Sequence, residues 1–300
     1  MAALSEHVAK AGLKTRFLLQ RRFQSVASRE WVAKRIANRV GRAQVPGTSE
    51  GRAAAAALDS EGFAMTPWLV SPDMAAEMRH YFAGHQSFNP YKRELGTFQA
   101  PDQAPPGTHV AHFKPEVVLN APHGLAIANH PAVLEAVQAA LGCKPTISYM
   151  AAWWSIAGHD QGQHAELFHR DYDDWRFIKM FVYLTDVDEG AGPHIYVRAT
   201  HRENQLMPIR RYSDDEVANA FGRERFIQFE GAAGTSFLEN TFGMHRGMPA
   251  RVTPRLMFSA VYCQGPILYG PLKPILDAKQ VEASSGLKLD PYVNRVYLRS

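Results

Sequence analysis

Three short segments in the second half of the chain carry residue types that bind metal ions and carboxylates. They are His169-Arg170-Asp171, Met244-His245-Arg246-Gly247 and Arg255, ten residues after the second histidine. On an extended strand, residues two apart point to the same side, so the first histidine and the aspartate can reach one cation. With His245 as third ligand they form the facial triad that leaves positions open on six-coordinate Fe(II).

Arg255 adds a permanent positive charge near this predicted metal site. A strand, a turn and a returning strand over residues 234–255 bring position 255 back beside position 245. The planar guanidinium holds a carboxylate through two parallel hydrogen bonds. A 2-oxo acid that chelates a metal at one end needs such a group for its far carboxylate. The spacing therefore predicts a metal site that takes a 2-oxo acid as co-substrate.

The spacing of one histidine and one acidic residue is not specific by itself. From 13 histidines and 29 acidic residues, about one His-x-Asp/Glu triplet is expected by chance. Three occur: His164-Ala165-Glu166, His169-Arg170-Asp171 and His201-Arg202-Glu203. The third triplet stays open as a competing candidate.

The segments around these residues predict a β-rich core. From Thr146 onward, aromatic and β-branched residues are separated by Gly, Pro, Asp or Asn, which is typical of short strands and turns. The predicted strands are 146–157, 163–169, 176–186, 193–198, 225–230, 234–239, 241–246 and 255–263. We expect a mostly β protein with N-terminal helices and a double-stranded β-helix core, the jelly-roll or cupin-like arrangement.

The residues before this core predict helices and one early strand. Helices are expected at 52–60, from Ser71-Pro72-Asp73 to about Phe82, and at 131–141, where capping residues and proline mark the second start. A loop over 83–108 and a strand over 110–119 lie between them. We expect one domain over 46–300, and its parts are helical support at 52–145, the core at 146–265 and a C-terminal extension at 266–300.

Residues 1–45 form a basic arm. Ten of its residues are Lys or Arg and two are Glu, so it carries a charge of +8, although the whole chain carries only +4. Apolar residues recur at helical spacing and predict an amphipathic helix or helix pair, interrupted at Gly12 or over 25–28. Contact with a membrane surface, a partner helix, an organellar transit peptide and a helix lying on the body all remain open.

Composition narrows the remaining classes of protein. The chain has 300 residues and only two cysteines, Cys143 and Cys263, which argues against a disulfide framework and for a reducing compartment. We expect a cytoplasmic protein. The body without the arm is mildly acidic, so no nucleic-acid partner is expected. The expected partner is a small-molecule substrate, and the arginines within 199–225 would suit an anionic one.

Residues 58–263 resemble the phytanoyl-CoA dioxygenase family of Fe(II)/2-oxoglutarate-dependent oxygenases. The resemblance covers about two thirds of the chain and depends on the order and spacing of several short motifs. These are Glu61-Gly62-Phe63, Ser71-Pro72-Asp73, His169-Arg170-Asp171, Tyr183-Leu184-Thr185-Asp186-Val187-Asp188, Gly192-Pro193-His194, Ala199-Thr200-His201-Arg202, and Met244-His245-Arg246-Gly247 with Arg255.

The resemblance implies a role for individual residues. His169, Asp171 and His245 would bind Fe(II), and Arg255 would bind the far carboxylate of 2-oxoglutarate. Lys114 lies where relatives often have a lysine that binds the co-substrate. Trp175 lies where some relatives have an aromatic residue that shields the site.

One departure from the family concerns the support of Arg255. Gly247 stands where members often have a hydroxyl residue beside the arginine. We therefore expect Ser259 or Thr235 to take that part.

The implied reaction consumes O2 and 2-oxoglutarate, releases succinate and CO2, and hydroxylates an unidentified small molecule. Two alternatives remain open. One is a cupin-like metal-dependent isomerase or hydrolase that does not use 2-oxoglutarate, and the other is a non-catalytic binding member of the fold.

Overall fold

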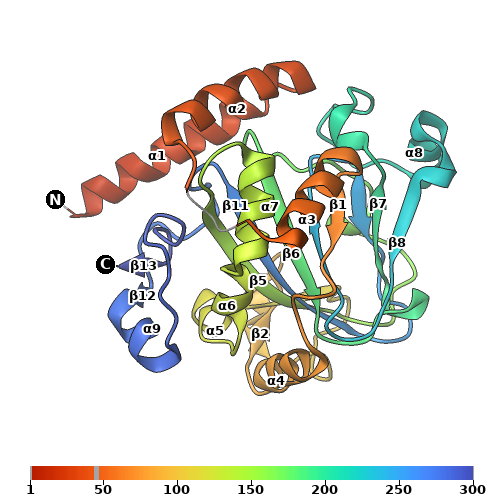
Figure 1. Ribbon diagram of the computed structural model, residues 1–300. Helices are drawn as coiled ribbons and strands as arrows, with labels where there is room; N and C mark the ends of the chain where they lie inside the picture. The colour runs from red at the N-terminus through yellow and green to blue at the C-terminus, as the bar shows by residue number, and fades with distance from the viewer. Residues whose placement is uncertain (1, 44–46, 300) are drawn as a thin grey trace.

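The computed structural model describes residues 2–43 and 47–299 (Figure 1). Pro46, where the sequence predicts the start of the body, lies outside the described residues. The helices are α1 (Ala2–Gln20), α2 (Val26–Val40), α3 (Ser49–Ser60), α4 (Pro72–Ala83), α5 (Pro115–Leu119), α6 (Gly124–Ala128), α7 (Pro131–Leu141), α8 (Asp214–Phe221) and α9 (Ala278–Ser285). No described helix is long and apolar enough to cross a membrane.

The strands form two larger sheets and one small one. They are β1 (Phe63–Met65), β2 (Ser87–Phe88), β3 (Thr97–Phe98), β4 (Val110–Phe113), β5 (Thr146–Ser155), β6 (Phe177–Tyr183), β7 (His194–Val197), β8 (Phe226–Phe229), β9 (Ser236–Glu239), β10 (His245–Gly247), β11 (Arg255–Cys263), β12 (Leu276–Asp277) and β13 (Leu298–Arg299). The major sheet has the antiparallel order β1-β9-β6-β11-β5-β4-β2-β3, and the minor sheet has the order β10-β7-β8. The architecture is mixed helix and sheet rather than mostly β.

Three predicted strands differ from the structure. The strand expected over 241–246 begins only at His245, as β10. Residues 163–169 contain a 3-10 turn at His164–Glu166, because Gln163 and Glu166 form a capping box and His164 adopts a positive φ of 51°. The expected strand over 110–119 ends at Phe113, where Pro115 starts α5. Proline fits the first turn of a helix and cannot donate to a strand ladder, so the chain leaves the sheet here.

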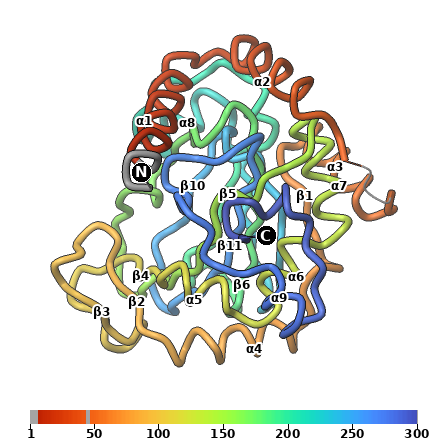
Figure 2. The backbone as a smooth tube through the Cα atoms, turned by 90° about the vertical axis from the view of Figure 1, so that its left-hand side faces the viewer, coloured from red at the N-terminus to blue at the C-terminus, as the bar shows by residue number. Residues whose placement is uncertain are grey.

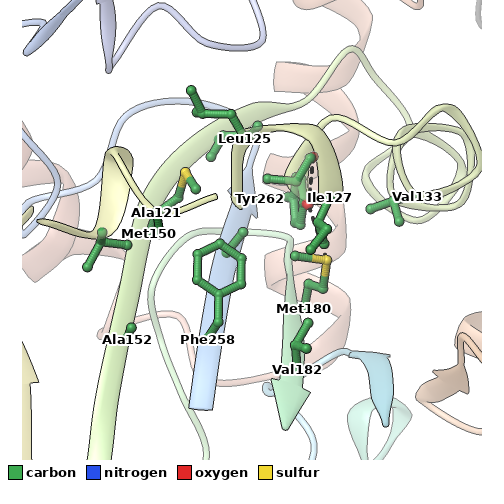
Figure 3. Close-up of a cluster of buried hydrophobic side chains, with 14 of the residues drawn as sticks. Ala121, Leu125, Ile127, Val133, Met150, Ala152, Met180, Val182, Phe258 and Tyr262 are labelled. Carbon is green, nitrogen blue, oxygen red and sulfur yellow. Dashed lines mark hydrogen bonds between the residues drawn. The ribbon is translucent and has the colours of Figure 1, made fainter. Parts of the chain in front are cut away.

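The major sheet is buried on both faces. One face packs against the helical layer that contains α3 and α7, and its side chains form the apolar cluster of Figure 3. Met180, Val182 and Phe258 point into this cluster, where Tyr262 donates a 2.8 Å hydrogen bond to the carbonyl of Ala128. The alternate residues of the same strands face the minor sheet, because strand side chains alternate. That second face holds the polar residues described below.

The basic arm forms α1 and α2 and lies across the end of the sheets opposite α4 (Figures 1 and 2). Helix α1 runs unbroken through Gly12, and the break falls before Ser25, whose hydroxyl accepts a hydrogen bond from the amide of Ser28 and caps α2. Gln20 donates to the carbonyls of Tyr172 and Asp173 at 2.7 and 3.0 Å. The arm is therefore packed on the body, in agreement with one of the four possibilities left open by the sequence.

Candidate metal centre

His169, Asp171 and His245 meet at one point between the two sheets. Each offers a ligand atom, and these atoms lie within 4.8 Å of one another. A reciprocal pair of backbone hydrogen bonds, 3.0 and 3.1 Å long, joins His169 to His245, and the amide of Asp171 donates to the carbonyl of Thr241 at 2.9 Å. This short antiparallel contact replaces the predicted strand. It still places His169 and Asp171 two residues apart on extended backbone.

Backbone carbonyls fix the orientation of both imidazoles. Nδ1 of His169 lies 2.8 Å from the carbonyl of Leu167, and Nδ1 of His245 lies 3.0 Å from the carbonyl of Gly243. With the proton on Nδ1, each Nε2 keeps its lone pair. The two Nε2 atoms lie 3.5 and 3.3 Å from the Asp171 carboxylate. Ligating histidines are commonly held in this way by a partner on the other ring nitrogen.

Lys179 sets the charge of the cluster. Its Nζ lies 2.6 Å from Asp171 and 2.9 Å from Asp173. Burial opposes ionisation of Asp171, but Lys179 and His245 outweigh it and hold the pKa of Asp171 well below its ordinary value. Burial and the neighbouring His245 lower the pKa of His169 to about 4. At neutral pH the cluster therefore offers an ionised carboxylate and at least one neutral imidazole, as a divalent cation requires.

Arg255 is a buried cation that forms no ion pair with an acidic side chain in the part of the chain that the structure describes. It is 4% exposed at the start of β11, where its guanidinium contacts the hydroxyl of Ser155 at 3.1 Å and the carbonyl of Gly192. Its Nε has no partner, and burial lowers its pKa. Ser155, rather than the expected Ser259 or Thr235, supplies the hydroxyl. It is the direct cross-strand neighbour of Arg255.

A chain of contacts joins Arg255 to the histidines. The Arg255 guanidinium lies 5.9 Å from the ring centre of Tyr183, and the Tyr183 hydroxyl accepts a 3.1 Å hydrogen bond from the amide of His194. The ring of His194 lies 5.5 Å from that of His245 and nearly parallel to it. The arginine and the three-residue cluster therefore belong to one interior.

The pair of His194 and Glu239 was missed by the sequence analysis. Nε2 of His194 lies 2.8 Å from Glu239, without hydrogen-bond alignment, and the glutamate is fully buried beside Lys179 on the neighbouring strand. Burial raises the pKa of Glu239 to about 8 and lowers that of His194 well below its ordinary value. A charged residue within the apolar segment Ser236–Glu239 was the available signal.

Lys114 lies outside this interior. It is exposed and precedes α5, and among the described residues its side chain has no hydrogen bond or ion pair. Two residues earlier, His112 of β4 pairs with Trp153 across the strands and stacks on its ring at 5.6 Å. Nothing in its placement supports a co-substrate role for Lys114.

Trp175 also points away from the cluster. Its ring packs edge-on against Phe23 at 5.5 Å and lies 5.7 Å from the Arg29 guanidinium, both from the arm. It lines a cavity of about 640 Å³ that also contains residues of α2, α3 and α7 and none of the three candidate ligands. The tryptophan is a contact of the arm, and the predicted shielding role is not supported by its position.

The competing triplet does not form a second cluster. His201 is buried, and its Nε2 lies 3.2 Å from the carbonyl of Asp59. Burial lowers the pKa of His201 to about 4. Glu203 pairs with Arg225 at 2.6 Å instead of with this histidine. Within the described ranges, His169, Asp171 and His245 are the group whose geometry suits a metal ion.

No protein-family model matches the chain, and no curated protein matches it. Among solved structures, the chain is similar to EctD from S. alaskensis in its apoform, with 17% identity, 85% of this chain and 88% of that chain covered, and a TM-score of 0.52. It is also similar to EctD from S. alaskensis with 2-oxoglutarate and 5-hydroxyectoine. Here the identity is 17%, 87% of this chain and 89% of that chain are covered, and the TM-score is 0.50. At this identity the likeness shows a shared fold.

Proposed function

We propose that the protein is an Fe(II)/2-oxoglutarate-dependent dioxygenase that hydroxylates a small molecule on a double-stranded β-helix core. The observation that carries the proposal is that a two-histidine, one-carboxylate cluster shares one interior with a buried arginine that forms no ion pair among the described residues and whose Nε has no hydrogen-bond partner there. The two facing antiparallel sheets support the jelly-roll assignment, and the overall likeness to EctD supports it as well.

The residues present fit an iron ion. Two imidazole nitrogens and one carboxylate on one side suit non-haem Fe(II), and they leave positions for a co-substrate and for O2. When bound, the metal supplies the activation of O2 that couples oxidation of the substrate to decarboxylation of 2-oxoglutarate. His169, Asp171 and His245 would hold it, and Lys179 keeps the aspartate ionised and oriented.

Arg255 fits the far carboxylate of 2-oxoglutarate. Leaving a buried guanidinium nitrogen without an acceptor costs free energy, and a carboxylate at this position would remove that cost. Ser155 and the carbonyl of Gly192 orient the guanidinium by hydrogen bonds. The reaction balances as substrate C–H, O2 and 2-oxoglutarate giving substrate C–OH, succinate and CO2.

The same observation disfavours the two alternatives. A cupin-like isomerase or hydrolase that does not use a 2-oxo acid has no need of a buried arginine beside the metal site that lacks an acidic partner among the described residues. A non-catalytic member has no need to keep all three ligands with their imidazoles oriented by carbonyls.

The test is to incubate the purified chain with Fe(II), 2-oxoglutarate and O2, and to measure succinate with and without a panel of small molecules. We expect slow succinate formation without substrate and faster formation with the right compound. His245→Ala is the matched control and should abolish both. Succinate formation that is equal in this variant and in the wild type would contradict the proposal.

A further inference from the structure

A cavity of about 400 Å³ opens over Asp171, and its walls come from separate parts of the chain. Phe17 of helix α1 and Arg21 in the turn after it form one wall. The segment after the 3-10 turn at residues 200–202 contributes residues 209–211. Residues 170–173 and Tyr269 complete it. Because a candidate metal ligand lines this cavity, it is the approach to the proposed reaction centre.

The part of α1 that lines the cavity is fixed to the same segment as Asp171. Gln20 donates to the carbonyls of Tyr172 and Asp173, Arg16 forms an ion pair with Asp174, and Arg29 of α2 donates to the carbonyl of Asp174. Asp174, Gln20 and Arg29 are buried, so the contacts that they share lie largely out of water. The arm is thus held in place as a wall of the cavity.

Most charges around the cavity already have partners. Arg170 donates to the carbonyls of residues 200, 203, 205 and 242, and Arg210 forms an ion pair with Glu216 at 2.6 Å. Asp171 and Asp173 share Lys179.

Arg21 and Arg211 are the exceptions. Neither has a carboxylate within ion-pair distance among the described residues, and Arg21 rests on the ring of Phe17 at 4.9 Å. Both side chains line the cavity, Arg21 from the arm and Arg211 from the segment before α8. Arg211 lines the same cavity as the candidate ligand Asp171.

We propose that this cavity binds the hydroxylated substrate through an anionic group, a carboxylate, phosphate or sulfate, held between Arg21 and Arg211. The proposal rests on the proposed function and extends it to the class of substrate. It also makes the arm part of the substrate site, because Arg21 lies in the arm, in the turn directly after α1. Arginine is suited to this task, since its guanidinium forms paired hydrogen bonds with oxyanions.

The test is calorimetric titration of the full chain with hexyl phosphate, hexyl sulfate and hexanoate, with 1-hexanol as the uncharged probe. At least one anion should bind and the alcohol should not. Arg21→Gln and Arg211→Gln should each weaken that binding about ten-fold, the size expected for one lost charge-assisted hydrogen bond. Arg211→Lys should restore part of it.

Arg223→Gln is the matched control, because Arg223 is exposed, pairs with Asp215 at 3.3 Å and does not line the cavity. No binding by any anion, equal binding in the cavity variants, or an equal loss in the control would overturn the proposal. Thermal unfolding of each variant checks that it is folded. Titration with Mn(II) and 2-oxoglutarate separates the two proposals, since wild-type protein that binds an anion through Arg21 and Arg211 but not 2-oxoglutarate would contradict only the proposed function.

Discussion

The two faces of strands β5, β6 and β11 differ in chemistry although both are buried. On β6, Ile178, Met180 and Val182 face the helices, whereas Lys179, Phe181 and Tyr183 face the minor sheet. The helix-facing side is apolar, as Figure 3 shows. The other side holds Lys179, Arg255 and the buried Glu239. Because alternate residues of a strand point to opposite faces, the apolar residues pack against the helices and the polar ones lie between the two sheets.

The difference shows where buried charge is retained. Charged groups in an interior cost free energy unless they are paired. On the face towards the minor sheet, here called the inner face, Lys179 pairs with two aspartates. Among residues 2–43 and 47–299, however, Glu239 has no aligned hydrogen bond and Arg255 has no acidic partner. On the helix-facing side of β6, by contrast, the residues are the uncharged Ile178, Met180 and Val182. The place of the charged groups on the inner face agrees with the proposed function, which needs a metal site and a carboxylate site there.

The largest expected effect belongs to the helix-facing side. Phe258→Ala removes a fully buried ring from the apolar cluster. The free energy of unfolding should fall by about 3–5 kcal/mol, measured by chemical denaturation. The folded fraction should still bind metal with wild-type affinity. Weaker metal binding with unchanged stability would contradict the division between the faces.

A substitution at the metal cluster should give the opposite result, with a large loss of activity and little loss of stability. His245→Ala should lower succinate formation at least about 100-fold, because loss of a partner one step outside a metal site already costs 10- to 100-fold. Its thermal midpoint in metal-free buffer should stay close to that of the wild type. A variant that unfolds but, where folded, keeps its activity would assign His245 to stability.

Arg255→Gln should affect the co-substrate more than the metal. The KM for 2-oxoglutarate should rise about ten-fold or more, because one charge-assisted pair of hydrogen bonds is lost. Mn(II) affinity without 2-oxoglutarate should be unchanged. Ser155→Ala is the milder companion and should give a smaller rise. A loss of metal affinity in Arg255→Gln would show that the arginine supports the cluster instead.

Glu239 predicts a pH dependence for the metal-free protein. Its folded pKa is about 8 and its ordinary value is 4.5, so between these values the folded state holds a proton that the unfolded state has released. Stability therefore falls as pH rises, by about 1 kcal/mol between about pH 7 and pH 8. Glu239→Gln should remove this part of the slope in denaturation measured at both pH values. Identical slopes in the two proteins would contradict the raised pKa.

The smallest effect is expected at Lys114. Because its side chain is exposed and unpaired, Lys114→Ala should change stability by no more than about 0.5 kcal/mol. The KM for 2-oxoglutarate should stay at the wild-type value. A ten-fold rise in this KM would restore the role that the family resemblance implies.

The spacing of His169 and Asp171 on extended chain predicted that these two side chains share one side. His245 was predicted as the third ligand from its own segment with Arg255 and from the order of the family motifs. The sequence predicted most core strands from local patterns as well. The helix at Pro115, which moves Lys114 out of the sheet, was also visible in the position of the proline. The prediction of a strand over 110–119 followed the apolar residues on both sides of Pro115 and passed over the proline.

Other features depend on contacts that one sequence does not reveal. Trp175 turns towards Phe23 because the arm docks beside Asp174, a contact between residues about 150 positions apart. His194 and Glu239 come from different sheets and meet only when the sheets face each other. Ser155 reaches Arg255 through strand register, which a single chain does not specify.

The most direct test of the metal centre is anaerobic titration of Fe(II) into the chain with 2-oxoglutarate present, followed by visible absorbance. We expect a weak charge-transfer band that saturates at one iron per chain, loses its intensity in His245→Ala and needs higher 2-oxoglutarate in Arg255→Gln. Folded wild-type protein that binds one iron but shows no band would contradict the 2-oxoglutarate assignment and favour a metal enzyme of another class.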